Sequence, residues 1–194
     1  VSHYVVSQKP IDREAYKRGT SVYLVDRVIP MLPEVLSNGI CSLNAGEDRY
    51  AMTCMMEIDT NGKVVNYRIQ PSIIHVNRRC SYKEIYKALT EDIIPDDLAP
   101  LMPMIHNLSD IAKTLNDMRR RRGALDFDFP EYKVLLDTEG TPLRIVRRDR
   151  TLAERLIEEC MLIANETVAT HLKNTNRTSV YRIHETPSEE KMSM

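Results

Sequence analysis

The sequence predicts an α/β fold of the mixed α+β kind, in one folded unit. β-rich segments flank a turn dipeptide at Asn61-Gly62, the strongest short hairpin signal. Amphipathic segments open with capping boxes at Ser81 and Thr151. No Gly/Ser-rich linker or internal repeat divides the 194 residues, and 42% apolar with 28% charged residues is typical of a globular chain. We therefore expect one domain or a large piece of a bigger one.

Short elements are predicted for the first part of the chain. Residues 1–6 alternate as a strand does. A proline and an aspartate then mark the start of a short helix over 13–18. Residues 23–29 are apolar and extended, and prolines interrupt the chain after them. One helical turn is predicted over 34–36, ended by a glycine.

Two hairpins and three longer helices are predicted for the remainder. The hairpins pair β-rich segments across glycine-containing turns: 49–59 with 64–76 and 131–137 with 143–148. The helices are expected over about 81–91, 104–122 and 151–173. In the first and third, Ser81 is followed by Glu84 and Thr151 by Glu154, as in a capping box. A last strand is predicted over 179–184.

Composition excludes several classes of protein. The chain has 27 basic and 28 acidic residues, which excludes a polycation that coats nucleic acid non-specifically. No apolar run approaches the roughly 18 residues of a membrane span, so we expect no membrane partner. The four cysteines form no C-x-x-C pair, which argues against zinc-ribbon and redox motifs. Buried, reduced thiols in a cytoplasmic protein are expected, and a disulfide framework is the alternative.

A run of arginines ends the helix predicted over 104–122: Arg119, Arg120, Arg121 and Arg122. Guanidinium forks match phosphate oxygens, so phosphate contacts are one interpretation. Cations also complement the dipole at a helix C-terminus, and the sequence alone favours this second interpretation. Three acids follow, Asp126, Asp128 and Glu131. They could hold Mg²⁺ or neutralise the arginines, and neutralisation is the better supported.

The helix predicted over 151–173 is amphipathic. Its apolar face gathers five residues: Leu152, Leu156, Cys160, Ile163 and Ala164. Glu154, Glu158 and Asn165 share the opposite stripe, which commonly faces solvent. No histidine pair at helical spacing, glycine-rich phosphate loop or nucleophile motif is found in the sequence. The residues by themselves therefore predict a mixed unit with basic patches and name no activity.

Longer sequence patterns are more specific. Residues 18–49 read RGTSVYLVDRVIPMLPEVLSNGICSLNAGEDR, after an opening VSHYV. RGALDFD over 122–128, LIEECM over 156–161 and YRIHETP over 181–187 follow in order. Together these patterns resemble the catalytic (RNB) domain of the ribonuclease R and ribonuclease II family, and bacterial ribonuclease R in particular. Members of this family are processive 3′-to-5′ exoribonucleases with a bent sheet and external helices.

The resemblance implies RNA-binding roles for four residues. Tyr23 and Phe127 match the aromatic clamp that stacks on the 3′-terminal bases of single-stranded RNA. The alternatives are a strand residue with a tethered hydroxyl for Tyr23 and a core aromatic for Phe127. Tyr82 matches a tyrosine near the bound ribose. Glu158 matches a glutamate that accepts from a ribose hydroxyl, a donor that DNA lacks.

The resemblance also implies that essential parts lie outside this sequence. The family's Mg²⁺ ligands, an aspartate cluster D-x₅-D-x-D-D, belong upstream of Val1. An S-P-I-R segment, whose arginine contacts the reacting phosphate, belongs beyond Met194, and cold-shock and S1 domains flank the catalytic domain. We expect residues 1–194 to be the central part of an RNB catalytic domain, inactive alone, with no catalytic residue and no bound metal. A catalytically degenerate, RNA-binding homologue and a purely structural domain are the alternatives.

Overall fold

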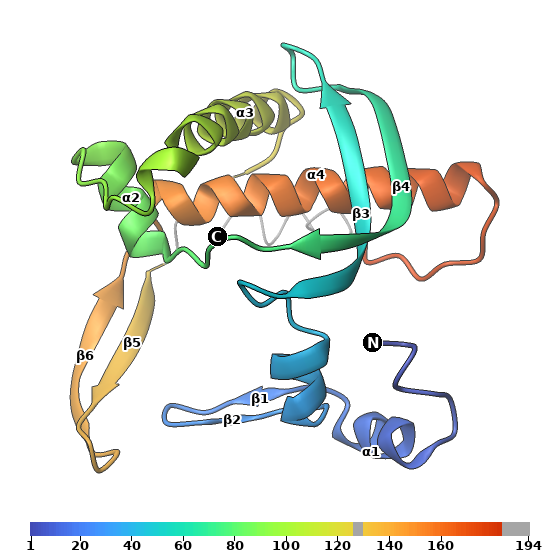
Figure 1. Ribbon diagram of the computed structural model, residues 1–194, viewed down its shortest axis with the longest axis vertical. Coiled ribbons are helices and arrows are strands. Elements are labelled where there is room, and N and C mark those ends of the chain that lie inside the picture. Colours follow the sequence, from blue (N-terminus) through green and yellow to red (C-terminus); the bar gives the residue numbers. More distant parts are fainter. Residues whose placement is uncertain (126–129, 184–194) are drawn as a thin grey trace, which may run out of the picture.

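The computed structural model describes residues 1–125 and 130–183 and confirms a mixed fold of helices and strands (Figure 1). Within the described residues the strands come in consecutive pairs separated by helical segments, which include a π-helical and a 3₁₀ segment. The elements are α1 (Pro10–Arg18), β1 (Val22–Tyr23), β2 (Val28–Ile29), η1 (Val35–Ile40), β3 (Asp48–Ile58), β4 (Val64–His75), α2 (Tyr82–Thr90), η2 (Ala99–Leu101), α3 (Met102–Arg121), β5 (Glu131–Leu136), β6 (Pro142–Arg148) and α4 (Leu152–Asn174).

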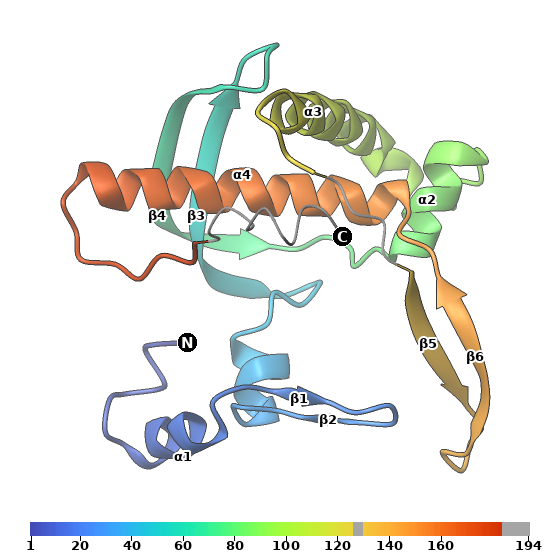
Figure 2. The same ribbon diagram turned by 180° about the vertical axis from the view of Figure 1, so that it is seen from behind.

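The strands of the described residues form three antiparallel, two-stranded sheets: β1–β2, β3–β4 and β5–β6. The β3–β4 hairpin is the longest and bends sharply along its length (Figure 1). Helix α4 crosses one side of this hairpin, and α3 lies beside α4, as the view from behind also shows (Figure 2). The bent sheet is therefore the β3–β4 hairpin, with α4 packed against it and α2 and α3 packed against α4.

The turn between β3 and β4 docks against α3. Asp59 Oδ1 accepts hydrogen bonds from the backbone N–H groups of Lys63 and Asn61, each at 2.9 Å, and these bonds lower the pKa of the Asp59 carboxyl. Gly62 has a φ of +86°, and a Cβ there would lie 3.2 Å from Met118 Cβ in α3. The turn therefore needs glycine both for its backbone conformation and for its approach to the helix.

Replacing Gly62 by alanine is expected to lower the free energy of unfolding by about 1–3 kcal/mol, because the new methyl group overpacks the contact with α3. Gly140 is a matched control, since it occupies the same position in a similar aspartate-led turn and has a φ of +85° with nothing within 4 Å of its Cβ position. Urea unfolding of both variants measures the difference. Equal losses for Gly62→Ala and Gly140→Ala would show that the contact with α3 contributes nothing.

The core that supports α2 lies where the chain passes from α2 into α3. Ala88, Leu98, Met102 and Ile105 are buried together, with partly buried side chains such as Ile85 packed against them. Helix α4 contacts both α2 and α3, so the three helices form one packed group. Among the described residues, no helix is long and apolar enough to cross a membrane.

Several predicted elements differ from the structure. Residues 1–6 form a turn, in which Val1 O accepts from the N–H groups of Tyr4 and Val5, and not a strand. The extended segment over 23–29 is a tight hairpin, β1–β2. Residues 179–183 are irregular, and residue 184 lies outside the described part. The four cysteines are free thiols as expected, but none is fully buried: Cys80 is exposed, and Cys41, Cys54 and Cys160 are partly exposed.

Candidate nucleic-acid interface

Tyr23 presents its ring to solvent. It ends β1 and pairs with Val28 of β2. In the turn that follows, the backbone N–H of Leu24 donates to the backbone oxygen of Arg27 at 2.8 Å. The Tyr23 side chain is 78% exposed. Within the described residues its hydroxyl makes no hydrogen bond, so the tethered-hydroxyl alternative is not what the structure shows. An exposed, uncommitted ring is suited to stacking on a base.

Phe127, the predicted partner of Tyr23 in the clamp, lies outside the described residues, as do Asp126 and Asp128. Glu131, the third acid of that group, begins β5 and lies 3.9 Å from Arg148 across the hairpin. Nothing in the described part therefore bears on a role of Phe127, which stays a prediction.

Tyr82 is the first residue of α2, and a network of charged hydrogen bonds fixes this end of the helix. The capping box between Ser81 and Glu84 is present as predicted. Arg78 donates to both oxygens of Glu84, at 2.6 and 3.0 Å, and to Asp97 at 2.7 Å. These hydrogen bonds lower the pKa of both carboxyls. Tyr82 is half-exposed on this fixed helix end.

Glu158 lies on the second turn of α4 and is paired with an arginine from the preceding loop. Arg150 Nε donates to Glu158 Oε1 at 3.0 Å, and Arg150 Nη2 donates to Glu158 Oε2. The capping box of Thr151 and Glu154 begins α4 between the two partners, as predicted. Glu158 is thus directed away from the core, and its carboxylate is part of a two-point ion pair.

The neighbouring residue, Glu159, is buried and was missed by the sequence analysis. Its side chain is 5% exposed, and its carboxylate accepts from Arg119 Nη2 at 2.7 Å and from Asn116 Nδ2 at 2.8 Å. Both partners belong to α3, so this contact joins α3 to α4. The helical spacing of the sequence could have indicated this burial. Glu159 lies three residues after Leu156 and four residues before Ile163, and both of these residues belong to the apolar face.

The four arginines of the predicted phosphate-binding run have different environments. Arg119 is paired with Glu159. Arg122 pairs with Glu166 of α4 at 2.9 and 3.2 Å, and this pairing raises the pKa of Arg122. Arg120 and Arg121 are exposed, and Arg121 makes one long contact, 3.4 Å, with a backbone oxygen of the β3–β4 turn. Phosphate contacts stay a prediction, and Arg120 and Arg121 are the members best placed for them.

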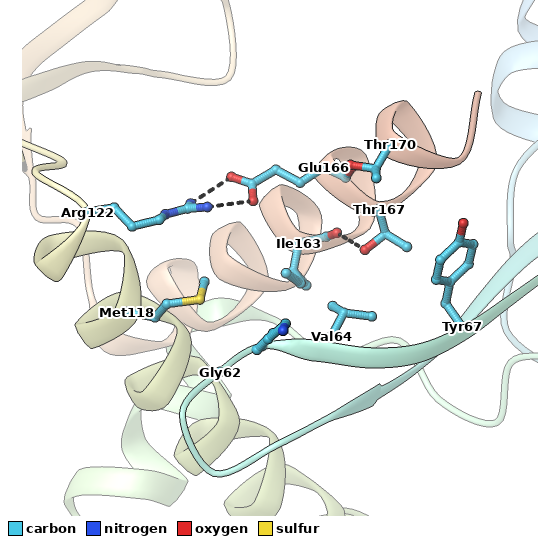
Figure 3. Close-up of a pocket in the computed structure, with 10 residues that line it drawn as sticks. Gly62, Val64, Tyr67, Met118, Arg122, Ile163, Glu166, Thr167 and Thr170 are labelled. Atoms are coloured by element: carbon cyan, nitrogen blue, oxygen red, sulfur yellow. Dashed lines mark hydrogen bonds and ion pairs between the residues drawn. The ribbon is translucent and has the colours of Figure 1, made fainter. Parts of the chain in front are cut away.

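A hollow of about 250 Å³ lies between the β3–β4 turn, the end of α3 and the second half of α4 (Figure 3). Met118 and Ile163 line its floor, and the Arg122–Glu166 ion pair lies at its edge. Thr167 uses its hydroxyl to donate to the Ile163 backbone oxygen at 2.8 Å. Among the described residues, the predicted phosphate contact Arg122 lines this hollow, whereas Tyr23, Tyr82 and Glu158 do not.

Two of the predicted contacts lie on neighbouring helices. Tyr82 and Glu158 belong to α2 and α4, which pack against each other, whereas Tyr23 belongs to the β1–β2 hairpin on another part of the molecule (Figure 1). Within residues 1–125 and 130–183, no group of three acidic, histidine or cysteine side chains could hold a metal ion.

Comparison with known proteins identifies the class and then the family. Residues 1–194 match the RNB domain. "Ribonuclease R 1" of Lactococcus lactis is 46% identical over 193 residues, which cover 99% of this chain and 24% of that protein. "Ribonuclease R" of Thermotoga maritima is 47% identical over 191 residues, 98% of this chain and 27% of that protein.

Solved structures agree. The structure of Mycoplasma genitalium RNase R in complex with ribose methylated single-stranded RNA matches with a TM-score of 0.92 at 32% identity, covering 99% of this chain and 30% of that one. Fold and sequence therefore place the chain among proteins that contain an RNB domain. The chain belongs to the RNB family, and it spans about a quarter of the length of its curated relatives.

Proposed function

We propose that this chain is the central part of the catalytic domain of a longer, cytoplasmic exoribonuclease. That protein removes nucleoside 5′-monophosphates from the 3′ end of single-stranded RNA by hydrolysis, processively. The match of the RNB domain to all 194 residues, with ribonuclease R relatives 46–47% identical, is the observation that carries the proposal. Exposed Tyr23 and the outward-facing Glu158 are consistent with it.

Within this proposal the chain holds the substrate and other segments supply the chemistry. Tyr23, Tyr82, Phe127 and Glu158 contact the 3′ end, while the Mg²⁺ ligands and the phosphate-contacting arginine belong to sequence outside residues 1–194. Because no described group fits a metal, we assign no step of hydrolysis to residues of this chain. Flanking cold-shock and S1 domains deliver the RNA in the proposed full-length protein.

Incubation of the full-length protein with Mg²⁺ and 5′-labelled single-stranded RNA tests the proposal. Release of nucleoside 5′-monophosphates with shortening from the 3′ end is the expected result. Salt-dependent binding without shortening would identify instead a catalytically degenerate RNA-binding homologue. Absence of binding at any salt concentration would leave only a structural domain, and both of these outcomes contradict the proposed activity.

Tyr23→Ala in the full-length protein is expected to change the length of the final undegraded oligonucleotide. Base–aromatic stacking is worth about 1–3 kcal/mol per base, so the variant should bind a short RNA about 5- to 150-fold more weakly. Gel analysis of limit digests measures the end product. Tyr50→Ala is the control, because Tyr50 is also highly exposed but lies on β3. An unchanged end product for Tyr23→Ala would remove Tyr23 from the clamp.

A further inference from the structure

The loop between β6 and α4 contains an arginine that the proposed function leaves unused. Arg150 lies between the last strand residue, Arg148, and the N-cap of α4, Thr151. Its guanidinium contacts Glu158 at two points: Nε donates to Oε1 at 3.0 Å, and Nη2 donates to Oε2. A fork that engages both oxygens fixes the plane of the carboxylate as well as its position.

The backbone that bears Arg150 is held on both sides. The N–H of Thr151 donates to Glu154 at 3.0 Å in the capping box. Arg148 lies 3.7 Å from Glu154, and Arg147 pairs with Asp149 at 2.9 Å. Arg150 therefore projects from a fixed loop, so its fork can hold the Glu158 side chain in one orientation. An unheld glutamate has rotamer freedom worth about 1.5–2 kcal/mol, which a ligand would have to remove on binding.

The ion pair is open to a ligand. The side chains of Arg150 and Glu158 are 30% and 40% exposed, in contrast to the buried pair that the neighbouring Glu159 makes. A carboxylate has about four lone-pair sites, and a two-point fork occupies two of them. The remaining sites of Glu158 can accept a hydrogen bond from a hydroxyl group. A partly exposed pair of this kind contributes little to stability.

We propose that Arg150 is a positioning residue that sets the ribose selectivity of the Glu158 contact. This inference rests on the proposed function, in which Glu158 accepts from a ribose 2′-OH. Arg150 orients the carboxylate before RNA arrives, so the hydrogen bond to the 2′-OH forms without a loss of side-chain freedom. Deoxyribose offers no donor to the same oriented carboxylate and gains nothing from it.

Equilibrium binding in EDTA tests this role without requiring hydrolysis. The full-length protein is titrated with a short fluorescent oligoadenylate made of ribose and with the same sequence made of deoxyribose. Loss of one charged hydrogen bond predicts that Glu158→Gln lowers the ratio of the two affinities about tenfold. Arg150→Gln should lower the ratio to a similar extent, and the double variant no further than either single one. Arg150→Lys keeps the charge without the fork and should lower the ratio by a smaller factor.

Arg147→Gln is the matched control, because Arg147 precedes the same helix but pairs with Asp149. Its affinity ratio should equal that of the unaltered protein. An unchanged ratio for Arg150→Gln, when Glu158→Gln lowers it, would overturn the positioning role and leave the proposed ribose contact intact. An unchanged ratio for Glu158→Gln would remove the ribose contact and the inference together. Failure to hydrolyse RNA in Mg²⁺ would contradict the proposed activity alone, since binding is measured separately.

Discussion

Glu159→Ala is expected to lower the free energy of unfolding by about 3–5 kcal/mol, because it breaks an ion pair between a buried glutamate and a partly buried arginine. Glu159 is 5% exposed, and it accepts from Arg119 and Asn116 of α3. Removing the carboxylate takes away the hydrogen bonds that Arg119 and the Asn116 amide donate at this interface. Urea unfolding followed by far-ultraviolet circular dichroism measures the loss.

Glu166→Ala is the control for this prediction. Glu166 lies on the same helix and also pairs with an α3 arginine, Arg122, but both side chains of that pair are about half exposed. Exposed pairs contribute about 0–1 kcal/mol, so the control should unfold close to the unaltered protein. The double replacement Arg119→Met with Glu159→Leu should recover most of the stability, because both charges of the pair are then replaced by apolar side chains of similar volume. A loss below about 1 kcal/mol for Glu159→Ala would show that the Arg119 charge does not depend on Glu159.

Features set by local chemistry could be predicted from the sequence. The Asn61-Gly62 turn forms because Asp59 caps it and glycine accepts a positive φ, and both capping boxes appear where Ser81 and Thr151 predict them. In each case the side chain bonds to a backbone N–H group only a few residues away, so the pattern is visible in a short stretch of sequence. The mixed fold, the two long hairpins and the three longer helices follow from them.

Features that depend on distant partners could not be predicted. Residues 1–6 alternate as a strand does, but a strand needs a neighbour to pair with, and in the described structure the segment forms a turn instead. The arginines that end α3 likewise have partners that are distant in the sequence. Arg119 and Arg122 could be matched to phosphate or to carboxylates, and only the packing of α4 shows that Glu159 and Glu166 pair with them.

The candidate site was predicted through resemblance rather than through composition. Helical periodicity places Glu158 off the apolar face, and the structure agrees, but periodicity does not indicate Arg150, which lies outside the helix. Tyr23 has no local signal that distinguishes a stacking residue from an exposed strand residue. Its exposure is a property of the tertiary structure, so the family pattern was needed to single it out.

Leu98→Ala is expected to lower the free energy of unfolding by about 2–5 kcal/mol, because it opens a cavity in a closed core. Leu98 is fully buried, with 0% exposure, and it packs with Ala88 of α2 and with Met102 and Ile105 of α3. Urea unfolding measures the total loss. Since this core holds α2 in place, amide hydrogen exchange should also quicken across α2, the helix that begins with Tyr82.

Two further variants decide whether the cavity is the cause. Leu98→Met keeps most of the volume and should cost less than about 1.5 kcal/mol. Leu143→Ala removes the same atoms from a side chain on β6 that is 67% exposed, and it should change stability by no more than about 0.5 kcal/mol. Equal losses for Leu98→Ala and Leu143→Ala would show that burial at this junction does not stabilise the chain. Leu98→Ala could also lower the free energy of unfolding strongly without changing amide hydrogen exchange in α2. That result would mean that the bonds from Arg78 to Glu84 and Asp97 hold the start of α2 without help from the core.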